Sequence, residues 1–303
     1  MPSDKKIERS TALSFGIFFS LIISFLMVVC SHSLWAFDLQ RIETPQAATK
    51  LRQMIVLDAR PVTKWREGHI PGAMSFSWEE YTRTDADGVK YRISPPEELA
   101  EALGSMGVSN SDAVLVYGDA DSSWGGEGWL AWMLAWLGHR GCVYFLDGGI
   151  QSWEESGQPI HSDSSSKRPK TTYQVNLQQQ VNISSEQLEA QQDHINLIDT
   201  RGYLTEWLPG HLPGAIHIPW EKFYQGLYRK TLSADALRSL LQKNGVDLKK
   251  PVVYYCSGGI RSGYAWLVHQ LSGLPSAINF EGGTEKWARK RPLAGGAEAD
   301  EDK

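Results

Sequence analysis

Tyr255-Cys256-Ser257-Gly258-Gly259-Ile260-Arg261-Ser262-Gly263 is the segment around which the rest of this sequence can be interpreted. The apolar run at residues 252–255 predicts a buried strand, and the apolar residues 264–268 predict a helix. A thiol therefore falls in a tight turn between a strand and a helix. Glycines let such a turn direct its N–H groups inward, and a helix N-terminus adds partial positive charge. Both effects favour the thiolate of Cys256, which is the nucleophilic form. A buried structural cysteine is the alternative interpretation.

The composition is that of an ordinary globular protein. The chain has 303 residues, enough for about two domains, with 42% hydrophobic and 21% charged residues. The formal net charge of −5 gives no support for a nucleic-acid partner. The sequence contains no metal-binding motif, phosphate-binding loop or basic strip, so we expect no metal and no cofactor.

Residues 1–36 have the layout of a secretory signal peptide. Lys5, Lys6 and Arg9 precede an apolar run at residues 12–29, and small residues follow it. The run is long enough that an uncleaved membrane anchor is an alternative, and lipid attachment at Cys30 is a third option. In all three cases the basic end stays inside and the remaining chain lies outside the cytoplasm. We therefore expect an exported protein in a bacterial periplasm, either soluble or anchored to the membrane.

Two cysteines, Cys142 and Cys256, remain beyond this leader. An exported protein can pair two such residues in a disulfide, but these lie in different halves of the chain. Cys142 opens the apolar run 142–146, which predicts a buried strand. We expect both thiols to be free and Cys142 to be structural. Because free thiols are usually avoided in an oxidising compartment, the presence of Cys256 suggests that it is used.

The two halves of the sequence repeat each other. Matching segments keep the same order along the chain: Asp58-Ala59-Arg60 with Asp199-Thr200-Arg201, Gly68-His69-Ile70-Pro71-Gly72-Ala73 with Gly210-His211-Leu212-Pro213-Gly214-Ala215, Trp78-Glu79 with Trp220-Glu221, and Gly148-Gly149 with Gly282-Gly283. The spacing between the copies changes by only a few residues. Ordered matches of this kind indicate a duplicated domain.

Each copy alternates short apolar strands with helical segments. Strands are predicted at residues 54–57, 113–117 and 143–146, and again at 195–198, 252–255 and 277–280; helices are predicted at 96–103, 128–137 and 233–241. This order predicts an α/β fold in which each copy is a mostly parallel sheet with helices on both faces. In such sheets ligands bind at the carboxyl ends of the strands, where Cys256 lies.

The predicted boundaries follow from the repeat and from composition. The first domain spans residues 37–161, a polar linker spans 162–175, the second domain spans 176–293, and an acidic tail predicted to be disordered spans 294–303.

With these motifs in place, the sequence resembles the rhodanese family, specifically the tandem two-domain sulfurtransferases, over residues 38–292. The resemblance implies that only the second copy is catalytic. The first copy agrees, because it has Gly118-Asp119 where the second has Cys256, and its loop is acidic. The resemblance also implies that Cys256 attacks the transferable sulfur of an anionic donor such as thiosulfate or 3-mercaptopyruvate. A persulfide forms, and cyanide or a thiol then takes the sulfur in a second step.

The candidate site residues come from the loop and one strand end. Cys256 is the candidate nucleophile, and the candidate substrate-binding residues are Ser257, Gly258, Gly259, Ile260, Arg261, Ser262 and Arg201. Arg261 either binds the donor anion or fastens the loop by pairing with a carboxylate. Arg201 has a structural alternative in a contact with Asp199, which is favoured because the thiol-free copy keeps the same pair. His69 and His211 occur in both copies, so we interpret them as turn residues.

The donor and the exact class of function stay open. The loop matches neither the basic loop typical of thiosulfate enzymes nor the Cys-Gly-Ser-Gly loop typical of mercaptopyruvate enzymes. A phosphatase on this fold would need five residues between cysteine and arginine, whereas four separate Cys256 from Arg261. A non-enzymatic sulfur carrier that delivers persulfide sulfur to a protein acceptor is the remaining alternative.

Overall fold

The computed structural model describes residues 37–162, 168–275 and 277–295. The predicted leader and Cys30 lie outside the described residues, as does the acidic tail beyond residue 295. Ala294, which the sequence analysis assigned to the tail, forms an antiparallel bridge with His211. Within the described ranges, no helix combines the length and apolarity needed to cross a membrane.

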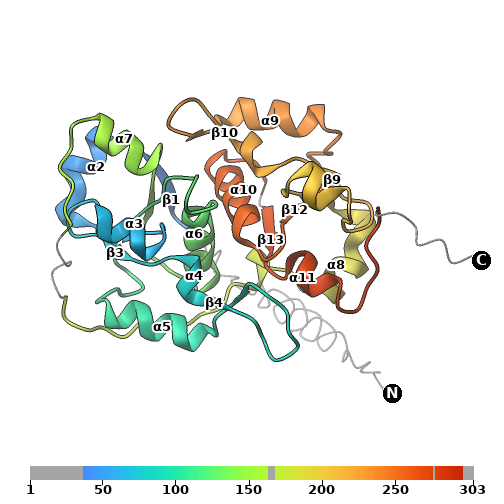
Figure 1. Cartoon of the computed structure of the whole chain (residues 1–303), viewed down its shortest axis with the longest axis horizontal. Helices are drawn as coiled ribbons and strands as arrows, with labels where there is room; N and C mark the ends of the chain where they lie inside the picture. The colour runs from blue at the N-terminus through green and yellow to red at the C-terminus, as the bar shows by residue number, and fades with distance from the viewer. Residues whose placement is uncertain (1–36, 163–167, 276, 296–303) are drawn as a thin grey trace, which may run out of the picture. The chain divides into compact units, whose positions relative to one another are not determined.

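Residues 37–295 contain two parallel sheets built alike (Figure 1). The first has the strand order β1 (Leu39–Ile42), β7 (Val143–Leu146), β6 (Val114–Tyr117), β2 (Ile55–Asp58) and β3 (Met74–Ser75). The second has the order β13 (Ala277–Phe280), β12 (Val252–Tyr255), β8 (Asn196–Asp199) and β9 (Ile216–His217). All neighbouring strands in both sheets run parallel. The predicted α/β fold with two repeated, mostly parallel sheets is confirmed.

The helices lie on both faces of each sheet. Their bounds are α2 (Thr44–Lys50), α3 (Val62–Glu67), α4 (Trp78–Tyr81), α5 (Pro96–Ser105), α6 (Gly126–Trp136), α7 (Gly149–Glu155), α8 (Ser185–Gln191), α9 (Ala234–Lys243), α10 (Ile260–Leu271) and α11 (Gly283–Trp287). Short 3₁₀ or π turns are η1 (Leu51–Gln53), η2 (Gln179–Val181), η3 (Gln192–His194), η4 (Tyr203–Trp207) and η5 (Trp220–Phe223). Two of these helices have side-chain caps, since the Ser184 and Ser233 hydroxyls accept bonds from N–H groups in the first turns of α8 and α9.

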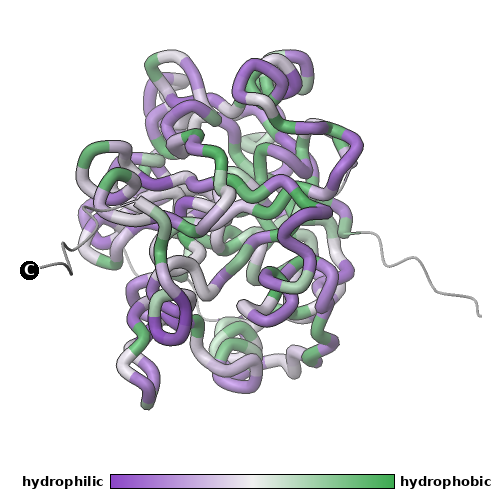
Figure 2. Tube along the Cα trace, turned by 90° about the vertical axis from the view of Figure 1, so that its right-hand side faces the viewer, coloured by the Kyte–Doolittle hydropathy of each residue, from purple (hydrophilic) through white to green (hydrophobic). Residues whose placement is uncertain are grey.

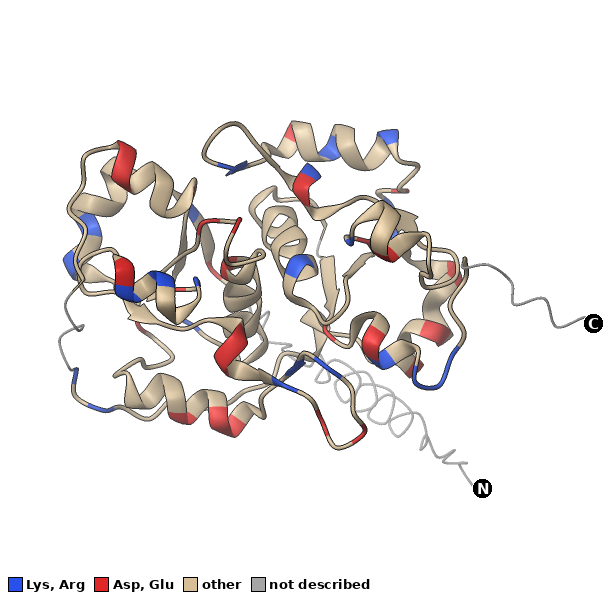
Figure 3. Ribbon diagram, viewed as in Figure 1, with Lys and Arg blue, Asp and Glu red and all other residues tan. Residues whose placement is uncertain are grey.

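The core of each domain joins strand residues to helices on one face. In the first domain, Val56 and Leu115 pack with Ala47 of α2 and Trp153 of α7. In the second, the strands pack with Leu188 of α8 and Trp287 of α11. Figure 2 shows the apolar residues concentrated inside and the polar residues on the outer turns. Figure 3 shows acidic and basic residues mixed over both domains.

Helices α6 and α10 pack against each other between the two sheets. A Cβ added at Gly128 would lie 2.3 Å from the Cα of Tyr264, and one at Gly263 would lie 2.9 Å from the Cα of Trp129. Glycine is therefore required at both positions for the backbones to come this close. This contact fixes the position of one domain on the other.

Two antiparallel hairpins, which the sequence analysis did not find, reach across between the domains. The hairpin of β4 (Thr82–Arg83) and β5 (Arg92–Ile93) contacts the second domain, where the Ile93 N–H donates to Glu281 Oε1 at 2.8 Å. The hairpin of β10 (Tyr224–Gln225) and β11 (Lys230–Thr231) contacts the first domain, where the Thr231 N–H donates to Asp147 Oδ1 at 2.8 Å. Each carboxylate directly follows the last strand of its sheet, so the two contacts mirror each other.

Candidate active site

Cys256 lies directly after β12, at the carboxyl end of the second sheet, as the sequence predicts. Its side chain is only 1% exposed, yet it lines a pocket of about 430 Å³. The thiol therefore forms part of the pocket floor. Both described cysteines are free thiols. Partial burial, with the nearby Asp38, raises the pKa of Cys142 to about 11, which keeps Cys142 protonated and unreactive.

The turn after Cys256 is short and fixed from two sides. Gly259 has a φ of +86° and precedes the first turn of α10, so the helix begins only four residues after the thiol. The Ser262 hydroxyl lies 3.6 Å from Cys256 Sγ and donates to it. The N–H groups of Thr284 and Glu285, in α11, donate to the carbonyls of Cys256 and Ser257 at 3.0 and 3.2 Å. The loop is therefore held between α10 and α11.

The repeated Gly-Gly motif explains how α11 reaches the loop. A Cβ at Gly283 would lie 2.4 Å from the Cys256 carbonyl oxygen and 2.3 Å from that of Ser257, and the φ of Gly283 is +53°. Only glycine allows this approach.

Arg261 fastens the loop through a carboxylate, which was one of its two predicted roles. Its Nη1 and Nη2 donate to Glu206 Oε2 and Oε1 at 2.6 and 2.7 Å. The Ser257 hydroxyl also donates to Glu206 Oε1, at 3.0 Å. Burial by itself would raise the pKa of Glu206, but the hydrogen bonds and charge of Arg261, aided by Gly202 and Ser257, lower it to about 2. The same pairing raises the pKa of Arg261, so both groups stay ionised.

Sequence reasoning missed Glu206. It lies in the π-helical turn η4. The backbone N–H of Gly202, which precedes this turn, donates to Glu206 Oε2 at 3.0 Å. The contact with Arg261 joins residues 55 positions apart, and no local pattern marks such a pair. The repeat contained one signal that could have pointed to Glu206. It aligns Trp65 with Trp207, so the thiol-free copy has Lys64 at the position where the copy with Cys256 has Glu206.

Arg201 lies outside the Cys256 pocket. It forms a buried ion pair with Asp199 at 2.6 Å and donates to the Gly210 carbonyl at 2.7 Å. It lines a neighbouring pocket of about 550 Å³ that shares Glu206 and Ser257 with the first. Arg60 makes the same contacts with Asp58 and Gly68 in the thiol-free domain. This geometry favours the structural interpretation of Arg201.

The two histidines of the repeated turns occupy matching positions. His211 stacks on Trp207 with ring centroids 3.6 Å apart, and His69 stacks on Trp65 at 4.5 Å. Each also bonds through Nδ1 to the carbonyl of that tryptophan. Since both domains build the same arrangement, the geometry favours a turn role for His69 and His211.

The opposite wall of the Cys256 pocket comes from the first domain. Trp78, Tyr91 and Trp124 line it, and we call these three side chains the aromatic wall. Tyr91 has a φ of +59° and packs on the loop, because a Cβ at Gly258 would lie 2.3 Å from the Tyr91 Cβ. The Trp78 indole N–H donates to the Ser123 carbonyl at 3.0 Å.

In the first domain, the turn after β6 corresponds to the Cys256 loop, and the Glu127 side chain fills it. A Cβ at Gly118 would lie 2.2 Å from Glu127 Oε2, so the Glu127 carboxyl occupies the space beside the position of the absent thiol. The Ser123 hydroxyl donates to this carboxyl at 2.6 Å. The cavity left there is about 10 Å³, too small for a substrate.

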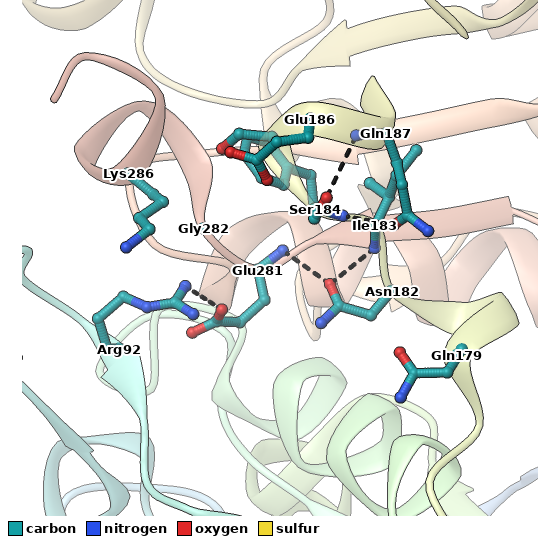
Figure 4. A pocket seen from close by; sticks show the side chains of 12 residues that line it. Arg92, Gln179, Asn182, Ile183, Ser184, Glu186, Gln187, Glu281, Gly282 and Lys286 are labelled. Atoms are coloured by element: carbon teal, nitrogen blue, oxygen red, sulfur yellow. Dashed lines mark hydrogen bonds and ion pairs between the residues drawn. The ribbon is translucent and has the colours of Figure 1, made fainter. Parts of the chain in front are cut away.

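A further pocket of about 190 Å³ is lined by Arg92 of the β4–β5 hairpin and by residues at the starts of α8 and α11 (Figure 4). Arg92 points toward Glu281 and pairs with its carboxylate, and the Asn182 amide oxygen accepts from the Glu281 N–H at 3.4 Å. The Arg92–Glu281 pair ties the hairpin that carries Tyr91 to the second domain. In the described part of the chain, no group of His, Cys, Asp and Glu side chains is arranged to hold a metal ion.

The comparisons with known proteins agree with this architecture. The family model for the rhodanese-like domain matches twice, at residues 40–156 and 184–290. The sulfur carrier protein TtuD of Thermus thermophilus is 30% identical over an alignment of 258 positions that covers 76% of this chain and 87% of that protein. The thiosulfate sulfurtransferase of Rattus norvegicus is 29% identical over 76% of this chain and 80% of its own length.

Two solved structures show the same fold. EanB in complex with hercynine is 26% identical with a TM-score of 0.69; the match covers 80% of this chain but only 64% of EanB. The 3-mercaptopyruvate sulfotransferase SseA from Escherichia coli is 20% identical with a TM-score of 0.71, covering 81% of this chain and 98% of SseA. The chain belongs to the rhodanese family, as a sulfurtransferase with two rhodanese-like domains in tandem.

Proposed function

We propose that Cys256 carries a sulfane sulfur as a persulfide between an anionic donor, such as thiosulfate or 3-mercaptopyruvate, and a thiophilic acceptor, cyanide or a thiol. The position of Cys256 carries the proposal: a thiol on the floor of a 430 Å³ pocket, at a strand end and just before a helix N-terminus. Relatives named thiosulfate sulfurtransferase support the reaction class. So does the solved structure of an EanB variant with ergothioneine covalently linked to a persulfide, which is 25% identical to this chain.

The reaction has two steps that balance. The Cys256 thiolate attacks the outer sulfur of thiosulfate, the sulfur–sulfur bond of thiosulfate breaks, and sulfite leaves with the bonding electron pair. The acceptor then attacks the outer sulfur of the persulfide. The persulfide bond breaks, and its electrons restore the Cys256 thiolate.

The loop supports these steps electrostatically. The Ser262 hydroxyl, which donates to Sγ, stabilises negative charge on the sulfur. The N-terminus of α10 and the N–H groups of residues 257–262 add partial positive charge around the terminal persulfide sulfur. Arg261 pairs with Glu206 and also interacts with Cys256, so it both fastens the loop and adds positive charge beside the sulfur.

A sulfur carrier is the second candidate, because a relative at 30% identity has that name. In that case Cys256 loads with sulfur but passes it to a protein thiol rather than to cyanide. The two functions share the persulfide and differ only in its acceptor.

The test is the intact mass of the full chain after thiosulfate or 3-mercaptopyruvate, and then after cyanide. Wild type should gain one sulfur atom and lose it with cyanide, Cys256→Ser should gain none, and the matched control Cys142→Ser should behave as wild type. Sulfur that loads but stays in place with cyanide, and leaves with a protein thiol, supports the carrier. If neither donor adds sulfur while Cys256 still alkylates, the proposal fails.

A further inference from the structure

The charges in the Cys256 pocket are already paired with each other. Among the described residues that line it, Glu206 and Arg261 are the charged ones, and they form a two-pronged ion pair. The Arg261 side chain is 13% exposed and that of Glu206 is 27% exposed. A donor anion that enters this pocket therefore meets a cation whose two terminal nitrogens already hold a carboxylate.

Glu206 is held in this position by hydrogen bonds from three residues. Its two oxygens accept bonds from Gly202 N–H, Ser257 Oγ and both terminal nitrogens of Arg261. Because its pKa is lowered to about 2, the carboxylate stays ionised at any ordinary pH. A dianion is repelled by this fixed negative charge and competes with it for Arg261.

The aromatic wall of the pocket is suited to contact with an apolar part of a substrate. Trp78, Tyr91 and Trp124 face the loop from the first domain, and Trp124 is 54% exposed, so its ring is available to a ligand. Aromatic rings gain most from stacking with planar or apolar groups. The pocket thus combines one nucleophilic sulfur, one compensated ion pair and three rings.

We infer that Glu206 and the aromatic wall set the specificity of the sulfur transfer proposed above. Glu206 covers the anion-binding side of Arg261 and selects against small dianionic donors such as thiosulfate. Over thiosulfate, the site prefers organic sulfur compounds with at most one negative charge and an aromatic or other apolar body, which the rings of the first domain contact.

Three donors separate the effect of charge from that of the ring. Thiosulfate is a small dianion, methanethiosulfonate is a small monoanion, and benzenethiosulfonate is a monoanion with an aromatic ring; all three supply a sulfane sulfur. In wild type, kcat/KM should rise in that order. Glu206→Gln should lower the KM for thiosulfate by about tenfold and change the two monoanions less. Trp124→Ala should reduce kcat/KM for benzenethiosulfonate by about tenfold relative to methanethiosulfonate.

Two variants act as controls for the charge change. Glu221→Gln removes the same charge at an exposed position of the second domain and should leave the order of the three donors as in wild type. Adding Arg261→Met to Glu206→Gln should remove the gain with thiosulfate, because the gain depends on the uncovered guanidinium.

The outcomes distinguish this inference from the proposed function. If Glu206→Gln lowers kcat equally for all three donors with KM unmoved, Glu206 only fastens the loop and the inference is overturned. A wild type that prefers thiosulfate to both monoanions also overturns it. If no donor loads a sulfur on Cys256 by intact mass, it is the sulfur transfer itself that fails.

Discussion

At the scale of single residues, the two domains differ in what fills the turn after the central strand. The second domain has the Cys256 thiol there, and the first has the Glu127 carboxyl beside Gly118. Glu127 is only 3% exposed, and burial raises its pKa to about 7 despite the bonds from the Ser123 hydroxyl and nearby N–H groups. Asp119 adds to the effect through its like charge. The turn without a thiol thus holds a carboxyl that burial makes difficult to ionise.

Glu127 should make stability fall as the pH rises. Its pKa is about 7 in the folded chain and near 4.5 when unfolded, so between these values the folded state holds the proton more tightly. The stabilisation is complete below pH 4.5 and is lost as the pH passes 7. We expect the unfolding free energy of wild type, relative to Glu127→Gln, to drop by roughly 2 kcal/mol between pH 5 and pH 8.

Urea unfolding of both proteins at the two pH values measures this drop. The comparison with Glu127→Gln is needed because His269 titrates in the opposite sense: burial lowers its pKa to about 4, so its contribution rises with pH. An equal difference between the two proteins at pH 5 and pH 8 would show that Glu127 does not titrate in this range.

At the scale of elements, three strands of each sheet could be predicted, whereas the sequence did not indicate β1, β3, β9 or the hairpins. Strands such as 252–255 and 277–280 are continuous apolar runs because both faces of a parallel sheet are covered, and the structure has them at those bounds. Each hairpin strand has two residues, such as Arg92–Ile93, with no periodic pattern to detect. These hairpins are fixed by contacts with the other domain, which a local pattern does not contain.

The same reasoning explains which site residues could be predicted. Cys256 and its loop are contiguous, so sequence alone locates them. Glu206 and Tyr91 reach the pocket only through folding, from a π-helical turn and from the other domain. The turn roles of His69 and His211 could be weighed only because the repeat supplied a thiol-free copy for comparison.

Breaking the contact of the β4–β5 hairpin should destabilise the protein. Glu281 is 2% exposed and pairs with Arg92, whose side chain is 26% exposed. Arg92→Ala would leave the carboxylate buried without its cation. We expect a loss of about 2 kcal/mol, below that of a fully buried pair because water still reaches the guanidinium. The matched control is Arg83→Ala in the same hairpin, which breaks an exposed pair with Glu98 and should cost about 0.5 kcal/mol.

Urea unfolding at pH 7 compares the two variants, and Arg92→Ala combined with Glu281→Gln provides the second half of the test. The neutral amide still accepts from the Ile93 N–H and should recover part of the loss. If Arg92→Ala and Arg83→Ala lower the free energy of unfolding by the same amount, the hairpin does not stabilise the protein by pairing with the buried charge of Glu281.

At the scale of the whole molecule, the pocket exists only because the two domains are fixed against each other. One domain supplies the thiol and its loop, and the other supplies the aromatic wall. The contact of α6 with α10 fixes this arrangement, and it depends on the absence of a side chain at Gly128 and Gly263. The thiol-free domain therefore contributes to the site without carrying out chemistry.

Gly128→Ala should loosen the pocket without touching any residue that lines it. The new Cβ would meet the Tyr264 Cα at 2.3 Å, and because this is backbone, no side-chain rotation relieves the overlap. We expect a loss of stability of about 1–3 kcal/mol. Cys256, now 1% exposed, should also alkylate faster as the aromatic wall moves away from the loop. Glu101→Ala, on the exposed face of α5, is the control and should change neither quantity. If the unfolding midpoint and the alkylation rate of Gly128→Ala both equal those of wild type, the close contact of α6 and α10 does not hold the pocket together.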